Sequence, residues 1–127
     1  MIDHGTVTEW LNAYVEAWKS YDPEAIGNLF AAGATYSYSP FDEEPIRGRD
    51  AIVANWIEYQ DAPGTYDAHY EPIAVDGNIA VANGRSRYFE ADGKTLRRVF
   101  DNIFVLSFDD QGQCVEFREW YMQQRGQ

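Results

Sequence analysis

Three residues of this sequence, Tyr14, His69 and Glu119, combine a group that exchanges protons with a predicted place beside aromatic residues. Loss of hydration in such a place raises the pKa of a carboxyl group such as that of Glu119 and suits it to proton transfer. An imidazole titrates near neutral pH, and a phenol in an apolar cavity seeks a hydrogen-bond partner. The three residues therefore predict acid/base catalysis. The structural alternatives are an ion pair of Glu119 with Arg85 or Arg87 and a partly exposed hydrogen-bonding role for His69.

A second set of residues is predicted to bind the molecule on which this chemistry acts. Arg85 has the forked guanidinium that clamps a carboxylate, and Asn83 lies two residues earlier, on the same side of a predicted strand. Charge balance against acidic neighbours is the alternative role for Arg85, and it is favoured for Arg87, Arg97 and Arg98. Apolar walls that carry few polar groups are typical of a small-molecule pocket. The other predicted substrate-binding residues are Trp18, Tyr38, Trp56, Asn102, Phe104 and Tyr121.

Metal and cofactor sites are not predicted. The chain has two histidines and one cysteine, and these residues lack the spacing that a zinc site needs. We therefore expect chemistry that uses neither a cofactor nor a metal.

Three helices in the N-terminal half are predicted to cover the site. The first begins at Thr6, where a capping box can form, and ends near Tyr21. The second starts at Asp22-Pro23, because an N-cap residue precedes a proline there, and Gly33 ends it. The third helix spans residues 49–60.

A short strand and four long antiparallel strands are predicted to form the rest of the domain. Glycines between the long strands favour tight hairpin turns. Helices followed by consecutive strands indicate an α+β fold, in which the helices cover one face of a curved antiparallel sheet. The predicted strands cover residues 35–39, 66–75, 79–89, 96–108 and 114–123.

The hairpins set a register, and the register decides which side chains face the helices. We assign Asn83 and Arg85 to the inward face, together with Asn102 and Tyr121, and Asp101 to the outward face. A slip of one residue in any strand would reverse its assignment. The predicted opposite pairs are His69 with Arg85, Glu71 with Asn83, Ile73 with Val81, and Phe104 with Glu119.

Composition and charge limit the possible partners. The 127 residues include 10 Lys and Arg against 21 Asp and Glu, which gives a net charge of −11. This charge repels nucleic acid and anionic membranes, so we expect neither as a partner. The length predicts a single domain over residues 1–127, and the absence of a visible signal or membrane segment predicts a cytoplasmic location. Apolar residues on the outward sheet face, such as Trp120 and Met122, predict a homodimer through the sheets.

Four segments carry a family resemblance that reaches from Thr6 to Gln124. The segments are Tyr14 to Ile26 with its Asp22-Pro23-Glu24, Ala34-Thr35 to Pro40-Phe41, Pro45-Ile46-Arg47-Gly48-Arg49 with Ile52, and Phe108-Asp109-Asp110-Gln111-Gly112. With these segments the chain resembles the nuclear transport factor 2-like superfamily, especially its SnoaL-like polyketide cyclase and ketosteroid isomerase branches. The resemblance implies a cone-shaped curved sheet. That fold hosts isomerases, cyclases, dehydratases, epoxide hydrolases and non-catalytic adaptors, so it does not define the reaction.

The resemblance also shows where this chain differs from a ketosteroid isomerase. Tyr14 matches the tyrosine that donates a hydrogen bond to the enolate oxygen in those isomerases. Ser39 stands where they have the aspartate that moves the proton, and Phe104 replaces their second oxyanion donor, so steroid isomerisation by that mechanism is not expected. Asn83 and Arg85 replace apolar pocket residues and imply a more polar ligand. Epoxide hydrolases of this fold hold a water between two aspartates and an arginine, and here only Glu119 offers a counterpart for the second aspartate.

We therefore expect a SnoaL-like, cofactor-independent acid/base enzyme of the cyclase, isomerase or dehydratase type that acts on a small oxygenated metabolite. The alternatives are a small-molecule-binding protein without catalysis and a dimerisation module without a ligand. Convergence of Tyr14, His69 and Glu119 on one point of a cavity would favour the enzyme.

Overall fold

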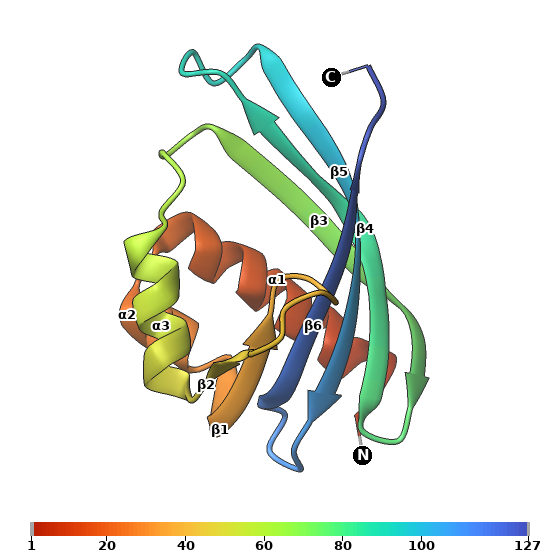
Figure 1. Ribbon diagram of the computed structural model, residues 1–127. Coiled ribbons are helices and arrows are strands. Elements are labelled where there is room, and N and C mark those ends of the chain that lie inside the picture. The colour runs from red at the N-terminus through yellow and green to blue at the C-terminus, as the bar shows by residue number, and fades with distance from the viewer. Residues whose placement is uncertain (1, 127) are drawn as a thin grey trace.

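The computed structural model describes residues 2–126, which form three helices and six strands (Figure 1). The strands make one curved, unclosed sheet in the order β2-β1-β6-β5-β4-β3, and β1 and β6 are the parallel pair. The predicted α+β class and curved sheet are confirmed, and the sheet contains one strand, β2, that the sequence did not predict. The bounds are α1 His4–Ser20, α2 Pro23–Gly27, α3 Arg49–Glu58, β1 Phe30–Ser37, β2 Ile46–Arg47, β3 Tyr66–Asp76, β4 Ile79–Phe89, β5 Leu96–Phe108 and β6 Cys114–Gln123.

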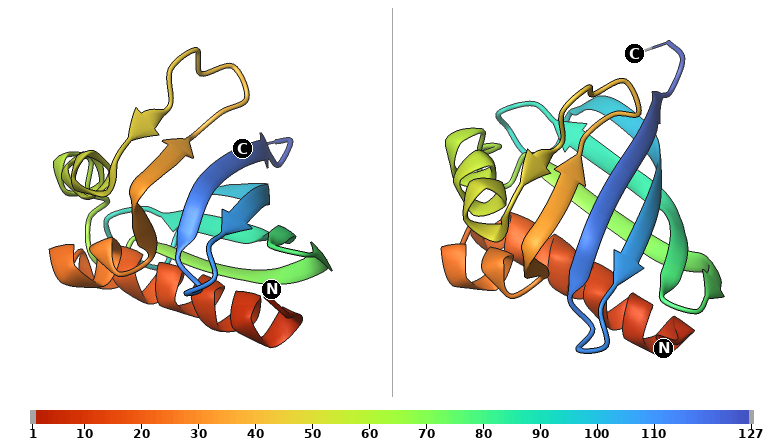
Figure 2. Two further views of the ribbon diagram at one scale, coloured as in Figure 1. Left: turned by 90° about the horizontal axis from the view of Figure 1, so that it is seen from below. Right: turned by 60° about the horizontal axis from the view of Figure 1, so that its bottom comes forward.

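The N-cap residue of helix α1 lies three residues before the predicted one, Thr6. Asp3 is the N-cap residue, and its side chain accepts a hydrogen bond from the backbone N–H of Thr6 at 2.8 Å. A carboxylate is a better partner than a hydroxyl for the free N–H groups of a first turn, which explains why Asp3 rather than Thr6 caps the helix. The helix ends at Ser20, close to the predicted end, and the cap residue Tyr21 has φ 50°. Figure 2 shows α1 lying along one face of the sheet.

Helix α2 is capped by Asp22 and has Pro23 in its first turn, as predicted. It ends at Gly27, well before Gly33, because the chain after it joins the sheet. The carbonyl of Leu29 accepts a hydrogen bond from the N–H of Cys114 at 2.9 Å, so the start of β1 pairs with β6 instead of continuing the helix. Tertiary pairing thus outweighs the local helical pattern.

The four long strands agree with the prediction to within a residue at each end. The predicted pairs of His69 with Arg85, Glu71 with Asn83, and Phe104 with Glu119 are confirmed. The pairing of Ile73 with Val81 is wrong, because the register shifts between Pro72 and Ala74 and places Ala74 opposite Val81. Proline has no N–H to donate to a neighbouring strand, which is typical of such an irregular position.

Aromatic rings fill the core between α1 and the sheet. The ring of Phe117 stacks on Tyr36 at 4.1 Å between centroids and on Tyr14 at 5.5 Å. Phe104 contacts Phe117 at 4.8 Å and Tyr70 at 4.6 Å. These rings are almost fully buried. They form a rigid base on which the polar side chains of β5 and β6 are held.

Candidate functional site

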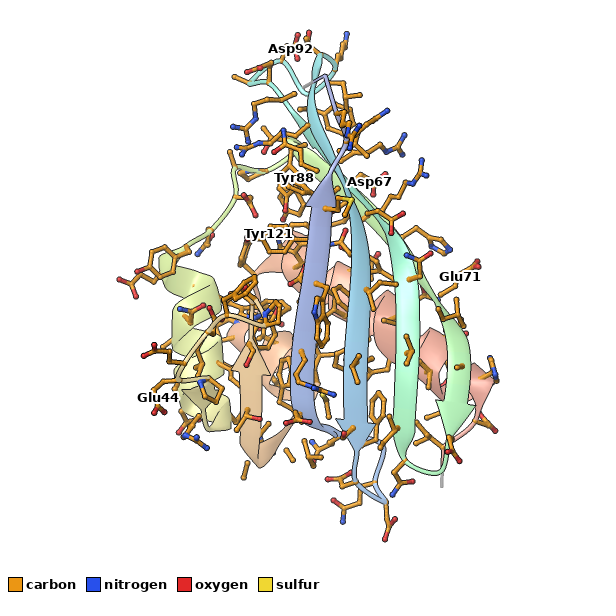
Figure 3. All side chains as sticks on the ribbon, turned by 45° about the vertical axis from the view of Figure 1, so that its right-hand side comes forward. Glu44, Asp67, Glu71, Tyr88, Asp92 and Tyr121 are labelled. Atoms are coloured by element: carbon orange, nitrogen blue, oxygen red, sulfur yellow. The ribbon has the colours of Figure 1, made fainter. Side chains whose placement is uncertain are left out.

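A cavity of about 650 Å³ opens between the sheet, α1 and α3. Figure 3 shows two of its lining residues, Tyr88 and Tyr121, beside the C-terminal part of β6, whereas Glu71 lies at the β3 edge of the sheet. Its volume is in the range of a small-molecule site. The lining residues are Tyr14, Trp18, Tyr21, Tyr36, Tyr38, Asn55, Trp56, Tyr59, Asp61, Tyr70, Ser86, Tyr88, Arg97, Arg98, Phe100, Asn102, Glu119 and Tyr121.

A chain of hydrogen bonds crosses three neighbouring strands and ends at Glu119. The hydroxyl of Ser86 on β4 donates to Oδ1 of Asn102 on β5 at 2.8 Å. Nδ2 of Asn102 then donates to Oε2 of Glu119 on β6, also at 2.8 Å. Ser86 and Asn102 are buried, so neither can exchange its partner for water easily. Ser86 therefore fixes the orientation of the amide, and the amide fixes the carboxyl group.

The carboxyl group of Glu119 has an unusual protonation equilibrium. Burial raises its pKa from 4.5 to about 7, while the hydrogen bond from Asn102 opposes this increase. Burial acts because the charged form loses its hydration, and the amide acts because it donates to the charged form. Near neutral pH, Glu119 is therefore present both as an acid and as a base, which is the condition for efficient proton transfer.

Phenol groups surround this carboxyl group. The hydroxyls of Tyr14 and Tyr36 lie 3.0 Å apart, and the hydroxyl of Tyr38 donates to Oδ1 of Asn55 at 2.8 Å. Burial raises the pKa of Tyr14 well above its usual value, and the negative charge of Glu119 raises it further. The phenols are therefore neutral hydrogen-bond donors at physiological pH, and Tyr14 together with Tyr36 forms a linked pair of donors.

Side chains from α1 meet the chain after α3 at the edge of the cavity. Nε1 of Trp18 donates to the hydroxyl of Tyr21 at 3.1 Å and to Oδ2 of Asp61 at 3.2 Å. The backbone N–H of Asp61 donates to the Tyr21 hydroxyl at 2.9 Å. Tyr66 completes the group, because its hydroxyl donates to the carbonyl of Trp18 at 2.6 Å. These contacts join α1 to the segment that follows α3.

Most of the predicted site residues lie around the cavity. Phe104 is the exception among the aromatic ones, because it is 1% exposed and packs in the core against Tyr14 and Tyr70. The predicted residues that line the cavity are Tyr14, Trp18, Tyr38, Trp56, Asn102, Glu119 and Tyr121.

Besides Phe104, three predicted site residues lie outside the cavity, and the predicted inward orientation of these three is wrong. His69 pairs with the carboxylate of Glu71 at 3.1 Å, and its side chain is 70% exposed. Nδ2 of Asn83 donates to Oδ1 of Asp101 at 2.8 Å, and Nε of Arg85 lies 3.5 Å from Oδ2 of the same carboxylate. The predicted outward direction of Asp101 is confirmed. The register on β3 and β4 is therefore correct for these residues, but the face is reversed.

Gly84 explains the reversal. It pairs with Tyr70 on β3 and with Asn102 on β5, and it faces the cavity side. A β-carbon at this position would lie 2.6 Å from Cδ1 of Tyr70 and in contact with the carbonyl oxygen of His69. The Tyr70 ring occupies the space that a side chain at position 84 would need. The inward face of β4 consequently carries Ala82, Gly84, Ser86 and the other residues at even-numbered positions of this strand.

Continuing the register from β5 to β4 would have found the missed residues. The sequence predicts Asn102 on the inward face, and its partner on β4 is Gly84, so Asn83 and Arg85 have to face outward. The same step places Ser86 and Tyr88 in the cavity. Other residues that the sequence prediction missed are Tyr21, Asn55, Tyr59, Asp61, Tyr70, Arg97, Arg98 and Phe100.

Most of the chain is similar to a known protein family. A model of a family described as the SnoaL-like domain matches residues 11–117. The chain belongs to the SnoaL-like family. The fold of this family occurs in cyclases, isomerases and hydrolases. No curated protein matches the sequence.

Two solved structures show the fold relationship of this SnoaL-like protein. An NTF-2 like protein of unknown function from Burkholderia xenovorans LB400 has a TM-score of 0.68 and 19% identity, with 92% of this chain and 83% of that chain covered. An LEH-like epoxide hydrolase from M. tuberculosis also has a TM-score of 0.68, with 16% identity and coverage of 94% and 84%. These similarities support the NTF2-like fold.

Two further features of the SnoaL-like protein concern metals and membranes. Within residues 2–126, no group of three His, Cys, Asp or Glu side chains has an arrangement that could hold a metal ion. No helix in this range has the length and apolar character needed to cross a membrane.

Proposed function

We propose that this protein is a cofactor-independent acid/base enzyme of the cyclase, isomerase or dehydratase type, and that Glu119 transfers the proton. The substrate is a small oxygenated molecule bound in the cavity. The observation that carries the proposal is Glu119 itself, a carboxyl group with a pKa of about 7 whose orientation is fixed by Asn102 and Ser86. A structural carboxylate is usually paired with a cation, and Glu119 takes part in no ion pair within residues 2–126.

The roles of the phenols follow from their hydrogen bonds. When Glu119 removes a proton from the carbon next to a carbonyl group, the bonding electrons move to the carbonyl oxygen and form an enolate. The hydroxyls of Tyr14 and Tyr36 are hydrogen-bonded and either can donate. When Tyr36 donates, the Tyr14 hydroxyl is left to donate to this enolate oxygen. Return of the proton from Glu119 to another carbon completes an isomerisation. In a dehydration the enolate instead re-forms the carbonyl and expels a β-hydroxyl group, which takes the proton from Glu119 and leaves as water. His69 has no part in this scheme because it lies outside the cavity.

Exchange of carbon-bound hydrogen for deuterium tests the proposal without knowledge of the natural substrate. The protein is incubated in D₂O with a panel of hydroxyketones and 1,3-dicarbonyl compounds, and loss of the α-proton signal is followed by NMR. We expect exchange with wild-type protein and at least a 100-fold slower reaction with Glu119→Gln. Glu116→Gln is the matched control, because Glu116 lies on the same strand, half exposed, and pairs with Arg118.

Two outcomes would contradict the enzyme proposal. Equal exchange rates for wild type and Glu119→Gln would show that Glu119 does not transfer the proton. Binding of panel members without exchange by any variant would instead support the non-catalytic binding protein.

We also propose that two copies associate through the outer face of the sheet. Trp120 is 37% exposed and Met122 is 76% exposed, and both lie on the face opposite to the cavity. Ile103 and Val105 on β5 belong to the same face. A second copy would remove these apolar side chains from water.

A further inference from the structure

Two arginines at the cavity have no acidic partner among residues 2–126. Arg97 and Arg98 both line the cavity, and within residues 2–126 neither of them forms an ion pair. The arginines of the outer face differ in this respect, because Arg85, Arg87 and Arg118 each lie within 3.5–3.7 Å of a carboxylate oxygen. The two arginines at the cavity therefore keep their donors available in a chain with twice as many acidic as basic residues.

Arg98 lies on the same wall as the proton-transfer group. Arg98, Phe100 and Asn102 are two residues apart along β5, and residues at this spacing on a strand point to the same face. Tyr88 is the partner of Arg98 on β4 and also lines the cavity. Four residues at about 3.4 Å each separate the α-carbons of Arg98 and Asn102 by about 14 Å. A ligand that contacts both Arg98 and Glu119 therefore has the length of a small metabolite.

The wall between these two ends is aromatic. The ring of Phe100 contacts Tyr88 at 5.8 Å and Tyr121 at 5.6 Å between centroids, in both cases edge to face. Phe100 therefore contacts both Tyr88 and Tyr121, which Figure 3 labels one above the other beside the C-terminal part of β6. These rings match the apolar body of a ligand, with a polar group at either end.

The charges of the site favour a ligand with one negative charge. The protein as a whole carries −11, so an anion is attracted only where cations reverse the field locally, as two unpaired arginines do at a concave surface. Asp61 and Glu119 also line the cavity, and they oppose a second negative charge on the ligand. A carboxylate fits this balance better than a phosphate dianion does, and its planar shape matches the guanidinium fork.

We propose that Arg98, assisted by Arg97, binds the carboxylate group of a ligand whose apolar body lies on Phe100, Tyr88 and Tyr121. This inference rests on the proposed function in one respect, since both place a small molecule in the same cavity. It assigns the substrate class as a monocarboxylic acid. The carboxylate anchors one end of the substrate, and the reacting oxygenated carbon lies at the other end, near Glu119.

Calorimetric titration at pH 7.5 with three probes of similar size tests this assignment. The probes are 3-phenylpropionate, its neutral amide 3-phenylpropanamide, and phenyl phosphate. We expect wild-type protein to bind the carboxylate about tenfold more tightly than either of the others, because a hydrogen bond to a charged group contributes about a factor of ten. Arg98→Gln should lose this preference and leave the affinity for the amide unchanged. Arg98→Lys, which keeps the charge but not the fork, should have an intermediate affinity.

Arg85→Gln is the matched control, because it removes an arginine from the other face of the same sheet. The assignment is wrong if Arg85→Gln and Arg98→Gln affect carboxylate binding equally, or if wild-type protein fails to distinguish the carboxylate from the amide. Tighter binding of phenyl phosphate would overturn the monocarboxylate class, and so would failure of all three probes to bind. Circular dichroism of each variant shows that the fold is retained.

The same titration with Glu119→Gln separates this inference from the proposed function. If the Arg98-dependent preference persists while no variant exchanges deuterium, the carboxylate site stands and the catalytic proposal fails. If Glu119→Gln abolishes exchange while Arg98→Gln binds the carboxylate normally, the catalytic proposal stands and the carboxylate site fails.

Discussion

Replacement of Glu119 by glutamine should make the protein more stable at alkaline pH, and by an amount that depends on pH. In the unfolded chain this carboxyl group ionises around pH 4.5, whereas in the folded protein its pKa is about 7. Between these values the folded state binds more protons than the unfolded state, so stability falls as the pH rises. Glutamine has nearly the same shape and still accepts the hydrogen bond from Asn102, but it has no charge to bury.

The magnitude follows from the two pKa values. Each pH unit between them corresponds to about 1.4 kcal/mol, so the interval from 4.5 to about 7 predicts a loss of about 3 kcal/mol in the wild type by pH 8. The variant lacks this loss. Its advantage over the wild type should therefore be below about 1 kcal/mol at pH 5 and grow to about 3 kcal/mol at pH 8. This is a large share of the stability of an ordinary domain.

Urea unfolding at pH 5, 6, 7 and 8, followed by tryptophan fluorescence, measures this difference. Glu116→Gln serves as the control, because a half-exposed carboxylate on the same strand should change stability by less than about 1 kcal/mol at every pH. A difference between Glu119→Gln and the wild type that stays constant from pH 5 to pH 8 would refute the reasoning. A carboxyl carbon signal of Glu119 that titrates near pH 4.5 would refute it independently.

Three further predictions concern the support of the site and the assembly. Asn102→Ala removes the donor that favours the charged form of Glu119, so the carboxyl carbon signal should titrate at higher pH than in the wild type; an unchanged midpoint would show that this hydrogen bond has no effect on the pKa. Gly84→Ala should lower the free energy of unfolding by about 2 kcal/mol or more through overpacking against Tyr70, whereas Gly33→Ala, which meets no atom within 4 Å, should not; equal urea midpoints would contradict the described orientation of Gly84. Wild-type protein should have twice its chain mass of 14.6 kDa in light scattering, and Trp120→Lys should shift it to the monomer; a monomeric wild type would exclude the dimer.

Strand positions could be predicted because the signals for them are local. The turns at Gly77, Gly93 and Gly112 all have positive φ in the structure, which glycine adopts without strain. The hairpins that they define kept their register over most of their length, so the pairs His69 with Arg85 and Phe104 with Glu119 were predictable. The bulge at Pro72 changed the pairing only towards the turn.

The polar pattern of a single strand does not show which of its side chains point into the cavity. In β4 both sets of alternating residues contain polar groups, so the pattern does not show which set is inward. Gly84 settles it, because its missing side chain makes room for the ring of Tyr70, its partner on β3, and the polar pattern of β4 does not show this contact. The predicted end of α2 is wrong for a similar reason. Leu29 and Phe30 fit a helical pattern, but their backbone carbonyls accept hydrogen bonds from Cys114 on β6 and from the Arg49 side chain.

The fixed hydrogen bond between Asn102 and Glu119 has a stereochemical consequence. Because Oε2 accepts the hydrogen bond from the Asn102 amide, the carboxyl group is held in one orientation and Oε1 is the oxygen left free of this bond to exchange a proton. A planar carbon lying against the tyrosine rings would then be protonated on one of its two faces. The product would then have a single handedness, which depends on Ser86, two strands away from Glu119, because Ser86 orients the Asn102 amide.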